Sequence, residues 1–207
     1  MAINGNDDTQ TMYVSFYDDN IFTTVTKDHR YVTAWISETT ANINRHRQII
    51  GLDVEWRPSY QRGVENPIAI LQLCVGHRCL IFQIINARYI PPSLFNFLNN
   101  PNYTFTGAGI HVDVEKLVQY YGLGGADNGR RLAADVVDLV GQAVQIYGMS
   151  VNGLGLKALA RMFLGKEPEK PKRVTTSNWE NYRLSDEQID YASIDAFLSF
   201  QIGMVLI

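Results

Sequence analysis

The chain has 207 residues, 46% of them hydrophobic and 19% charged, with a formal net charge of −3, which is typical of one globular domain and excludes a largely disordered protein. Its two cysteines are too few for a disulfide framework, no apolar run is long enough to cross a bilayer, and the polar opening lacks the layout of a secretory signal. We therefore expect a soluble protein of the nucleus or cytoplasm, folded as one domain over 1–207 behind a polar tail of about residues 1–10.

The first half of the chain is predicted to hold most of the strands. Short β-rich runs joined by turn residues indicate two hairpins, and one stretch with a single apolar face indicates a helix between them. The expected elements are a hairpin of Met12–Phe16 and Ile21–Val25 turning at Asp18–Asn20, a helix from Asp28 to about Arg47, a strand through Asp53 and Glu55, a polar loop over Pro58–Pro67, and a hairpin of Ile68–Val75 and Arg78–Gln83.

The second half is predicted to be mainly helical. Ser185, three residues before Gln188, resembles a capping box that opens the last helix. Strands first and helices after indicate an α/β protein, with a mixed sheet covered by helices. The expected elements are a short helix Pro91–Leu98, a strand Tyr103–Gly109, helices over Val112–Tyr121, Leu132–Tyr147, Gly153–Leu164 and Ser185 to about Val205, and a Lys/Pro/Thr-rich loop over Gly165–Trp179.

Two acids end the apolar strand that contains Gly51 to Trp56. Side chains two residues apart on a strand point to one face, so Asp53 and Glu55 project together while Leu52 and Val54 pack behind them. Paired carboxylates repel unless a cation lies between them, and oxygen ligands suit Mg²⁺ or Mn²⁺ better than zinc. A solvated strand end is the alternative for this segment alone.

A third acid, Asp113, follows the small residues Gly107, Ala108 and Gly109 at the start of a helix. Small residues let other groups approach closely, which suits a site, whereas a first-turn acid can also serve only to stabilise the helix dipole. The segment does not match a dinucleotide fingerprint, because Val112 stands at the third glycine position.

Near the end, Tyr191 and Asp195 are four residues apart and therefore share one helix face. The apolar residues around them indicate that this helix packs inward, so the acid needs a partner near buried surface. Taken alone, such a pair is more often an ordinary hydrogen-bonded Tyr and Asp.

Taken together, five segments resemble the DEDDy-type 3′-5′ exonucleases of the DnaQ-like, RNase H-like fold, and within them the Werner syndrome exonuclease domain and its stand-alone plant relatives. The resemblance runs from about Ile49 to Phe200. The matching segments are Gly-Leu-Asp-Val-Glu-Trp (51–56), Ile-Leu-Gln-Leu-Cys (70–74), Gly-Ala-Gly-Ile-His-Val-Asp-Val-Glu-Lys-Leu (107–117), Ser-Asn-Trp (177–179) and Tyr-Ala-Ser-Ile-Asp-Ala (191–196).

The resemblance implies a role for each of the five residues. Asp53 would bridge two divalent cations, Mg²⁺ or Mn²⁺, Glu55 and Asp195 would complete the shell of the first, and Asp113 would hold the second. Tyr191 would orient the attacking water. Two metals about 4 Å apart supply what phosphodiester hydrolysis needs, namely an activated water and stabilisation of the developing charge. The implied activity is release of nucleoside monophosphates from single-stranded or 3′-recessed ends. The chain stops soon after the third motif, so no helicase region is expected.

Several residues are candidates for substrate contact. Between Arg130 and Arg183 there are nine Lys and Arg against five acids, so this segment could face phosphates although the whole chain is mildly acidic. An apolar or aromatic residue beside the first acids could stack on the terminal base. The basic loop residues could equally be solvated. The candidates are Trp56, Lys170, Lys172, Arg173, Ser177, Asn178 and Trp179.

Three functions remain open from the sequence: an exonuclease acting on DNA, which we favour, an RNA-trimming exonuclease, and a nucleic-acid-binding or scaffold protein with little or no activity. A zinc site at Cys74, His77 and Cys79 is disfavoured, because a structural zinc normally takes four ligands. The apolar end over Ile202–Ile207 is expected to be buried, with a homo-oligomer as one way to cover it.

Overall fold

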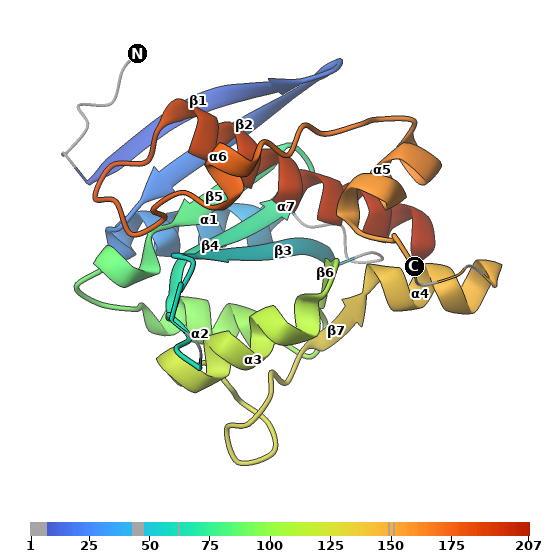
Figure 1. Ribbon diagram of the computed structural model, residues 1–207. Coiled ribbons are helices and arrows are strands. Elements are labelled where there is room, and N and C mark those ends of the chain that lie inside the picture. Colours follow the sequence, from blue (N-terminus) through green and yellow to red (C-terminus); the bar gives the residue numbers. More distant parts are fainter. Residues whose placement is uncertain (1–7, 43–47, 62, 149, 151) are drawn as a thin grey trace.

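The computed structural model describes residues 8–42, 48–61, 63–148, 150 and 152–207 (Figure 1). Within these residues the centre of the molecule is a seven-stranded mixed sheet in the order β1-β2-β5-β4-β3-β6-β7. The strands β2 and β5, β3 and β6, and β6 and β7 pair in parallel, whereas the other neighbours are antiparallel. The strand bounds are β1 Thr9–Phe16, β2 Asp19–Thr26, β3 Ile49–Trp56, β4 Ile68–Val75, β5 Arg78–Phe82, β6 Thr104–Gly107 and β7 Asp135–Asp138.

Helices cover both faces of the sheet (Figure 1). One face packs against α1 (His29–Asn42), α2 (Pro92–Leu98) and α3 (Ile110–Tyr121), and the other against the long helix α7 (Asp186–Leu206). Around α7 lie three shorter helices, α4 (Leu139–Tyr147), α5 (Leu156–Leu164) and α6 (Lys172–Thr175). A 3₁₀ turn, η1 (Ile84–Asn86), follows β5. The result is the three-layer α/β arrangement expected for a mixed sheet that buries both faces.

The alternation along β3 divides core from site. Leu52 and Val54 are 1% and 3% exposed and lie in the core under α1, α2 and α3. Asp53 and Glu55 point to the opposite face, which is the face that α7 crosses. This crossing is close because residue 51 is glycine: a Cβ there would stand 2.1 Å from the carbonyl oxygen of Ala196.

Most of the expected elements are confirmed, and one helix is wrong. The predicted helix over Leu132–Tyr147 is instead the edge strand β7 followed by α4, because the β-branched pair Val136 and Val137 extends β6 in parallel and Asp138 caps the helix that follows. The first hairpin turns at Tyr17 and Asp18, since Asp19 and Asn20 already belong to β2. The predicted end of the first helix, residues 43–47, lies outside the described residues.

The C-terminal helix begins with the predicted capping box, in which the Ser185 hydroxyl accepts from the Gln188 amide. By length and composition α7 could cross a membrane, but 61% of its apolar window is buried inside the fold and it contacts most strands of the sheet. The prediction of a buried end holds for one side of the helix: Ile202 and Leu206 are buried, whereas Val205 and Ile207 are about half exposed.

Candidate active site

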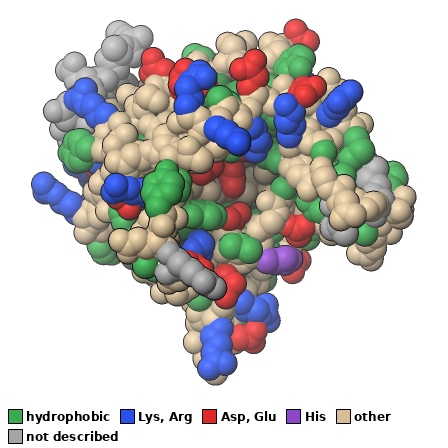
Figure 2. All heavy atoms as spheres, viewed as in Figure 1, with side chains coloured by type: hydrophobic (Ala, Val, Ile, Leu, Met, Phe, Trp, Pro, Cys, Tyr) green, Lys and Arg blue, Asp and Glu red, His purple; other side chains and the backbone are tan. Residues whose placement is uncertain are grey.

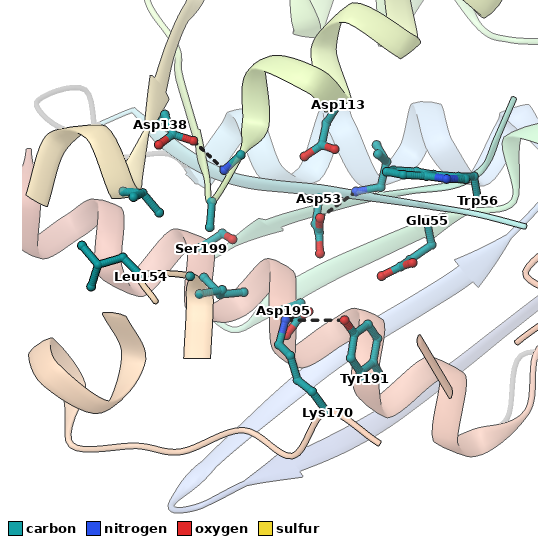
Figure 3. Close-up of a pocket in the computed structure, with 16 residues that line it drawn as sticks. Asp53, Glu55, Trp56, Asp113, Asp138, Leu154, Lys170, Tyr191, Asp195 and Ser199 are labelled. Atoms are coloured by element: carbon teal, nitrogen blue, oxygen red, sulfur yellow. Dashed lines mark hydrogen bonds and ion pairs between the residues drawn. The ribbon is translucent and has the colours of Figure 1, made fainter. Parts of the chain in front are cut away.

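The carboxylates of β3 open into a cleft of about 550 Å³ beside α7 (Figure 3). Asp53 lies on its floor, where its Oδ1 accepts a hydrogen bond of 3.0 Å from the Val54 amide. Glu55, two residues on, points into the same space, and Trp56 forms part of the wall. The strand therefore delivers two acids to one cavity, as their spacing predicts.

The helix α7 supplies the opposite wall. Tyr191 and Asp195 lie one turn apart on the face of α7 that lines the cleft, and Asp195 is 2% exposed. Because Gly51 admits the α7 backbone against β3, Asp195 is held near Asp53 rather than a side-chain layer away. The ring of Trp179 lies 5.9 Å from the ring of Tyr191 and supports it from behind.

The third wall comes from the turn between β6 and α3. A Cβ at Gly107 would stand 2.6 Å from the carbonyl oxygen of Leu52, and Gly109 has φ +79°, so this sharp turn requires glycine at both positions. It places Asp113 in the first turn of α3, 7% exposed and facing the cleft. Three separate segments thus bring four carboxylates into one cavity.

A lysine from the α5–α6 connection reaches into the same cavity. Lys170 Nζ lies 2.6 Å from Oδ2 of Asp195 and 3.5 Å from the Tyr191 hydroxyl (Figure 3). The side chain of Lys170 is 29% exposed and that of Asp195 is 3% exposed. The ammonium group therefore supplies positive charge within the cluster of acids.

The acids of the cleft share an environment that disfavours their charged forms. Burial, together with the charge of Asp195, raises the pKa of Asp53 to about 7. Burial, together with Asp53 and Asp138, raises the pKa of Asp113 to about 8. Burial also raises the pKa of Glu55, and that of Tyr191, which keeps the phenol protonated. Such acids take up protons near neutral pH unless a cation stabilises their charged forms.

The site also contains an acid that the sequence reasoning missed. Asp138, at the end of β7, lines the cleft and accepts hydrogen bonds from the backbone amides of Gly109 (2.5 Å) and Gly141 (2.8 Å). It therefore ties the starts of α3 and α4 together next to Asp113. The signal in the sequence was a capping Asp directly after two β-branched residues, which the prediction of a continuous helix concealed.

The donor set of the cleft fits hard divalent cations. Carboxylate oxygens are the ligands that Mg²⁺ and Mn²⁺ prefer, and burial raises the pKa of Asp53 and of Asp113, so a bound cation would stabilise their charged forms. As the described side chains stand, no three His, Cys, Asp or Glu are close enough to hold one ion together. The Lys170 ammonium group lies 2.6 Å from Oδ2 of Asp195 and so occupies one oxygen of a predicted metal ligand.

The predicted substrate residues divide into three groups. Trp56 and Lys170 line the cleft. The prediction is wrong for Trp179, which is 0% exposed and packs behind Tyr191. The remaining candidates lie outside the cleft lining: Lys172 and Arg173 are exposed on α6, where Arg173 pairs with Glu187, and Ser177 and Asn178 accept hydrogen bonds from Gln188.

Figure 2 shows the hollow from outside, with acidic side chains in its floor and Lys and Arg side chains gathered along the rim over α5 and α6. At the far end of the β4–β5 hairpin, Cys74 and Cys79 are buried free thiols, and His77 bonds to Asp19 instead of joining them.

A mixed sheet with this strand order, whose central strand and covering helix join their acids in one cleft, defines a nuclease-type domain of the RNase H-like fold. The chain belongs to the 3′-5′ exonuclease family, whose model matches residues 26–206.

Curated relatives agree with this assignment. The chain is 36% identical over 159 residues to a 3′-5′ exonuclease of Arabidopsis thaliana, covering 76% of this chain and 52% of that protein. It is 30% identical over 151 residues to the mouse bifunctional 3′-5′ exonuclease/ATP-dependent helicase WRN, covering 72% of this chain and 10% of that protein. The chain thus spans about half the length of the plant relative and a small part of the mouse one.

Solved structures share the fold at low sequence identity. Escherichia coli RNase D aligns with a TM-score of 0.70 at 16% identity, covering 88% of this chain and 43% of that one. The EXO domain of Aedes aegypti Nibbler aligns with a TM-score of 0.67 at 19% identity, covering 88% and 85%. These alignments confirm the predicted RNase H-like fold.

Proposed function

We propose that this chain is a metal-dependent 3′-5′ exonuclease that hydrolyses the last phosphodiester bond of a nucleic acid strand and releases nucleoside monophosphates. The observation that carries the proposal is the convergence of Asp53, Glu55, Asp113 and Asp195 with Tyr191 in one cleft. This is the residue set that the family resemblance predicts, brought together from three elements that are distant in sequence.

Each side chain has a distinct role in this proposal. Asp53, Glu55 and Asp195 would hold one divalent cation, and Asp53 with Asp113 would hold another. When bound, such a pair lowers the pKa of an attacking water and stabilises charge on the phosphate and the departing 3′ oxygen. Tyr191, protonated at neutral pH, positions the attacking water through its hydroxyl group.

Two further cleft residues face the substrate. Lys170 places a positive charge where the terminal phosphate would lie, which offsets repulsion between phosphate and carboxylates. Trp56 offers an aromatic surface beside Glu55 on which the terminal base could stack. Both would act on any nucleic acid 3′ end, single-stranded or 3′-recessed.

DNA is our first choice of substrate, and RNA is a second candidate with support of its own. RNase D, a fold neighbour, is described as an exoribonuclease involved in structured RNA processing, and Brucella melitensis NrnC, with a TM-score of 0.61, is described as bound to pGG. Besides acids, small residues and apolar groups, the cleft lining holds Lys170, Tyr191 and Ser199, and these residue types are compatible with either sugar.

The deciding experiment incubates the protein with 5′-labelled DNA and RNA strands of matched sequence in Mg²⁺, Mn²⁺ or EDTA and follows the length of the labelled strands. We expect stepwise shortening from the 3′ end with either metal, no reaction in EDTA, and loss of activity in Asp53→Asn. Equal activity in Asp53→Asn would refute the assigned site. Strand binding without any shortening, in wild type with either metal, would indicate a scaffold protein instead.

A further inference from the structure

A second hollow, of about 510 Å³, opens near the ends of β2 and β5. The strands β2, β5 and β3 run in the same direction, so they end at the same edge of the sheet as the catalytic acids (Figure 1). The hollow is lined by polar, charged and aromatic side chains: Asp8, Lys27, Asp28, His29, Arg30, Asn86, Arg88, Tyr89 and Tyr182.

The strand register gives the separation of the two sites. Thr26 pairs with Phe82, Phe82 with Leu71, and Leu71 with Val54, so these residues form one row across four strands. Three inter-strand spacings amount to about 14 Å. Lys27 follows Thr26 and Glu55 follows Val54, so the hollow begins about 14 Å from the catalytic cleft at the same level of the sheet.

Two cations of the hollow, Arg30 and Arg88, are exposed, whereas Lys27 is buried. The side chain of Asp28 is 8% exposed and accepts from both the backbone and the guanidinium of Arg30, whereas the Arg30 side chain is 67% exposed. Arg88 forms no ion pair within 4.0 Å among the described residues. Together with a hydrogen bond from Tyr182, its charge contributes to lowering the pKa of Asp8. Lys27 lies between Asp8 and the ring of Tyr182.

Aromatic rings accompany these cations. Tyr89 and Tyr182 are 51% and 57% exposed, so both rings are open to solvent at the hollow. His29 contacts the ring of Tyr89 edge to face at 5.2 Å. Exposed aromatic rings beside cations provide the two contacts that single-stranded nucleic acids use, base stacking and phosphate pairing.

An arginine connects this hollow with the cleft. Arg57 directly follows Trp56 of the cleft wall, and its guanidinium lies 3.4 Å from the carboxylate of Glu180. The backbone oxygen of Glu180 accepts from Asn86, which lines the hollow. The Arg57 side chain is 56% exposed, so a strand leaving the cleft would meet a cation before it reached the hollow.

We propose that the hollow at the ends of β2 and β5 binds the nucleic acid strand upstream of the 3′ end that the cleft holds, with Arg88 and Arg30 on phosphates and Tyr89 on a base. A span of 14 Å corresponds to about four stacked nucleotides at about 3.4 Å each. This inference rests on the proposed exonuclease function, since it assigns the 3′ end to the cleft.

The test measures binding and cleavage separately, as a function of strand length, for DNA and RNA. Binding of labelled dinucleotides and octanucleotides is followed by fluorescence anisotropy in EDTA, and their cleavage in Mg²⁺. The test protein carries Arg88→Ser and Tyr89→Ala together. The matched control carries Arg130→Ser on the α3–β7 connection and Tyr147→Ala at the end of α4, which are exposed residues outside the hollow.

Wild type is expected to bind octanucleotides at least about tenfold more tightly than dinucleotides, and the Arg88/Tyr89 double variant to lose most of this gain. Dinucleotide cleavage should stay at the wild-type rate in both double variants. The inference is overturned if the Arg88/Tyr89 variant binds octanucleotides as wild type does, or if the control loses as much affinity. Length-dependent binding that is lost in the Arg88/Tyr89 variant, without cleavage by wild type, would refute the proposed function and leave only strand binding by the hollow. Absence of both binding and cleavage would refute the two proposals together.

Discussion

Lys170 Nζ lies 2.6 Å from Oδ2 of Asp195, which joins the α5–α6 connection directly to the helix that carries Tyr191. Burial lowers the pKa of the Lys170 ammonium, but the charges of Asp195, Asp53 and Glu55 outweigh burial and raise it. The lysine is therefore charged at neutral pH and competes with any metal ion for the Asp195 carboxylate.

Replacing this lysine should separate metal binding from catalysis. In Lys170→Met, we expect Mn²⁺ to bind about threefold to tenfold more tightly because a competing cation is gone. Turnover should fall, since the phosphate loses a positive partner. Calorimetry with Mn²⁺ and steady-state rates measure the two effects, and Lys172→Met on the exposed face of α6 is the control. Weaker Mn²⁺ binding in Lys170→Met would contradict the competition.

The raised pKa values of the acids predict how stability depends on pH. Asp53 and Asp113 have folded-state pKa values of about 7 and about 8, above their unfolded values, so the folded protein binds more protons than the unfolded chain between about pH 4 and pH 8. In EDTA, Tm should therefore fall as the pH rises through this window. The Asp53→Asn, Asp113→Asn double variant should show a flatter profile in thermal melts, and added Mg²⁺ should reduce the fall in wild type. A Tm in EDTA that rose with pH across this window would contradict these shifts.

Tyr191 is expected to act on the attacking water and not on metal binding. Tyr191→Phe should lower kcat by about tenfold to a thousandfold, within the range of positioned catalytic groups, while Mn²⁺ affinity stays near wild type. The ring packing against Trp179 would be retained, so Tm should change little. Steady-state kinetics together with Mn²⁺ calorimetry test this, and a large loss of Mn²⁺ affinity would assign the tyrosine to a different role.

Substitution of Gly51 tests whether the active site needs the close packing of α7 against β3. In Gly51→Ala the new Cβ would collide with the Ala196 carbonyl, so α7 must move away from β3. We expect a loss of about 1–3 kcal/mol in the free energy of unfolding, as for overpacked cores. Activity should fall further than stability explains, because Asp195 moves with the helix. Denaturant melts of wild type and Gly51→Ala give the loss of stability, and rates measured where both proteins are folded give the loss of activity. The control is Gly63→Ala in the exposed loop after β3, although the positive φ of Gly63 adds some strain. Full activity in folded Gly51→Ala would show that Asp195 does not need this close approach.

The sequence by itself determined much of the fold and the composition of the site. Alternation along β3 separated Leu52 and Val54 from Asp53 and Glu55, and the four-residue spacing placed Tyr191 and Asp195 on one helix face. These features depend on near neighbours in the chain, which periodicity describes well.

Only the tertiary structure decided how distant segments meet. Three contacts illustrate this: Lys170 pairs with Asp195, Trp179 is buried behind Tyr191, and Asp138 accepts from the amides of Gly109 and Gly141. The local sequence of these residues is compatible with a solvated loop or a continuous helix. The strand β7 likewise exists because β6 offers it an open parallel edge. Local patterns cannot report such contacts, because their free energy comes from partners that only the folded chain brings within reach.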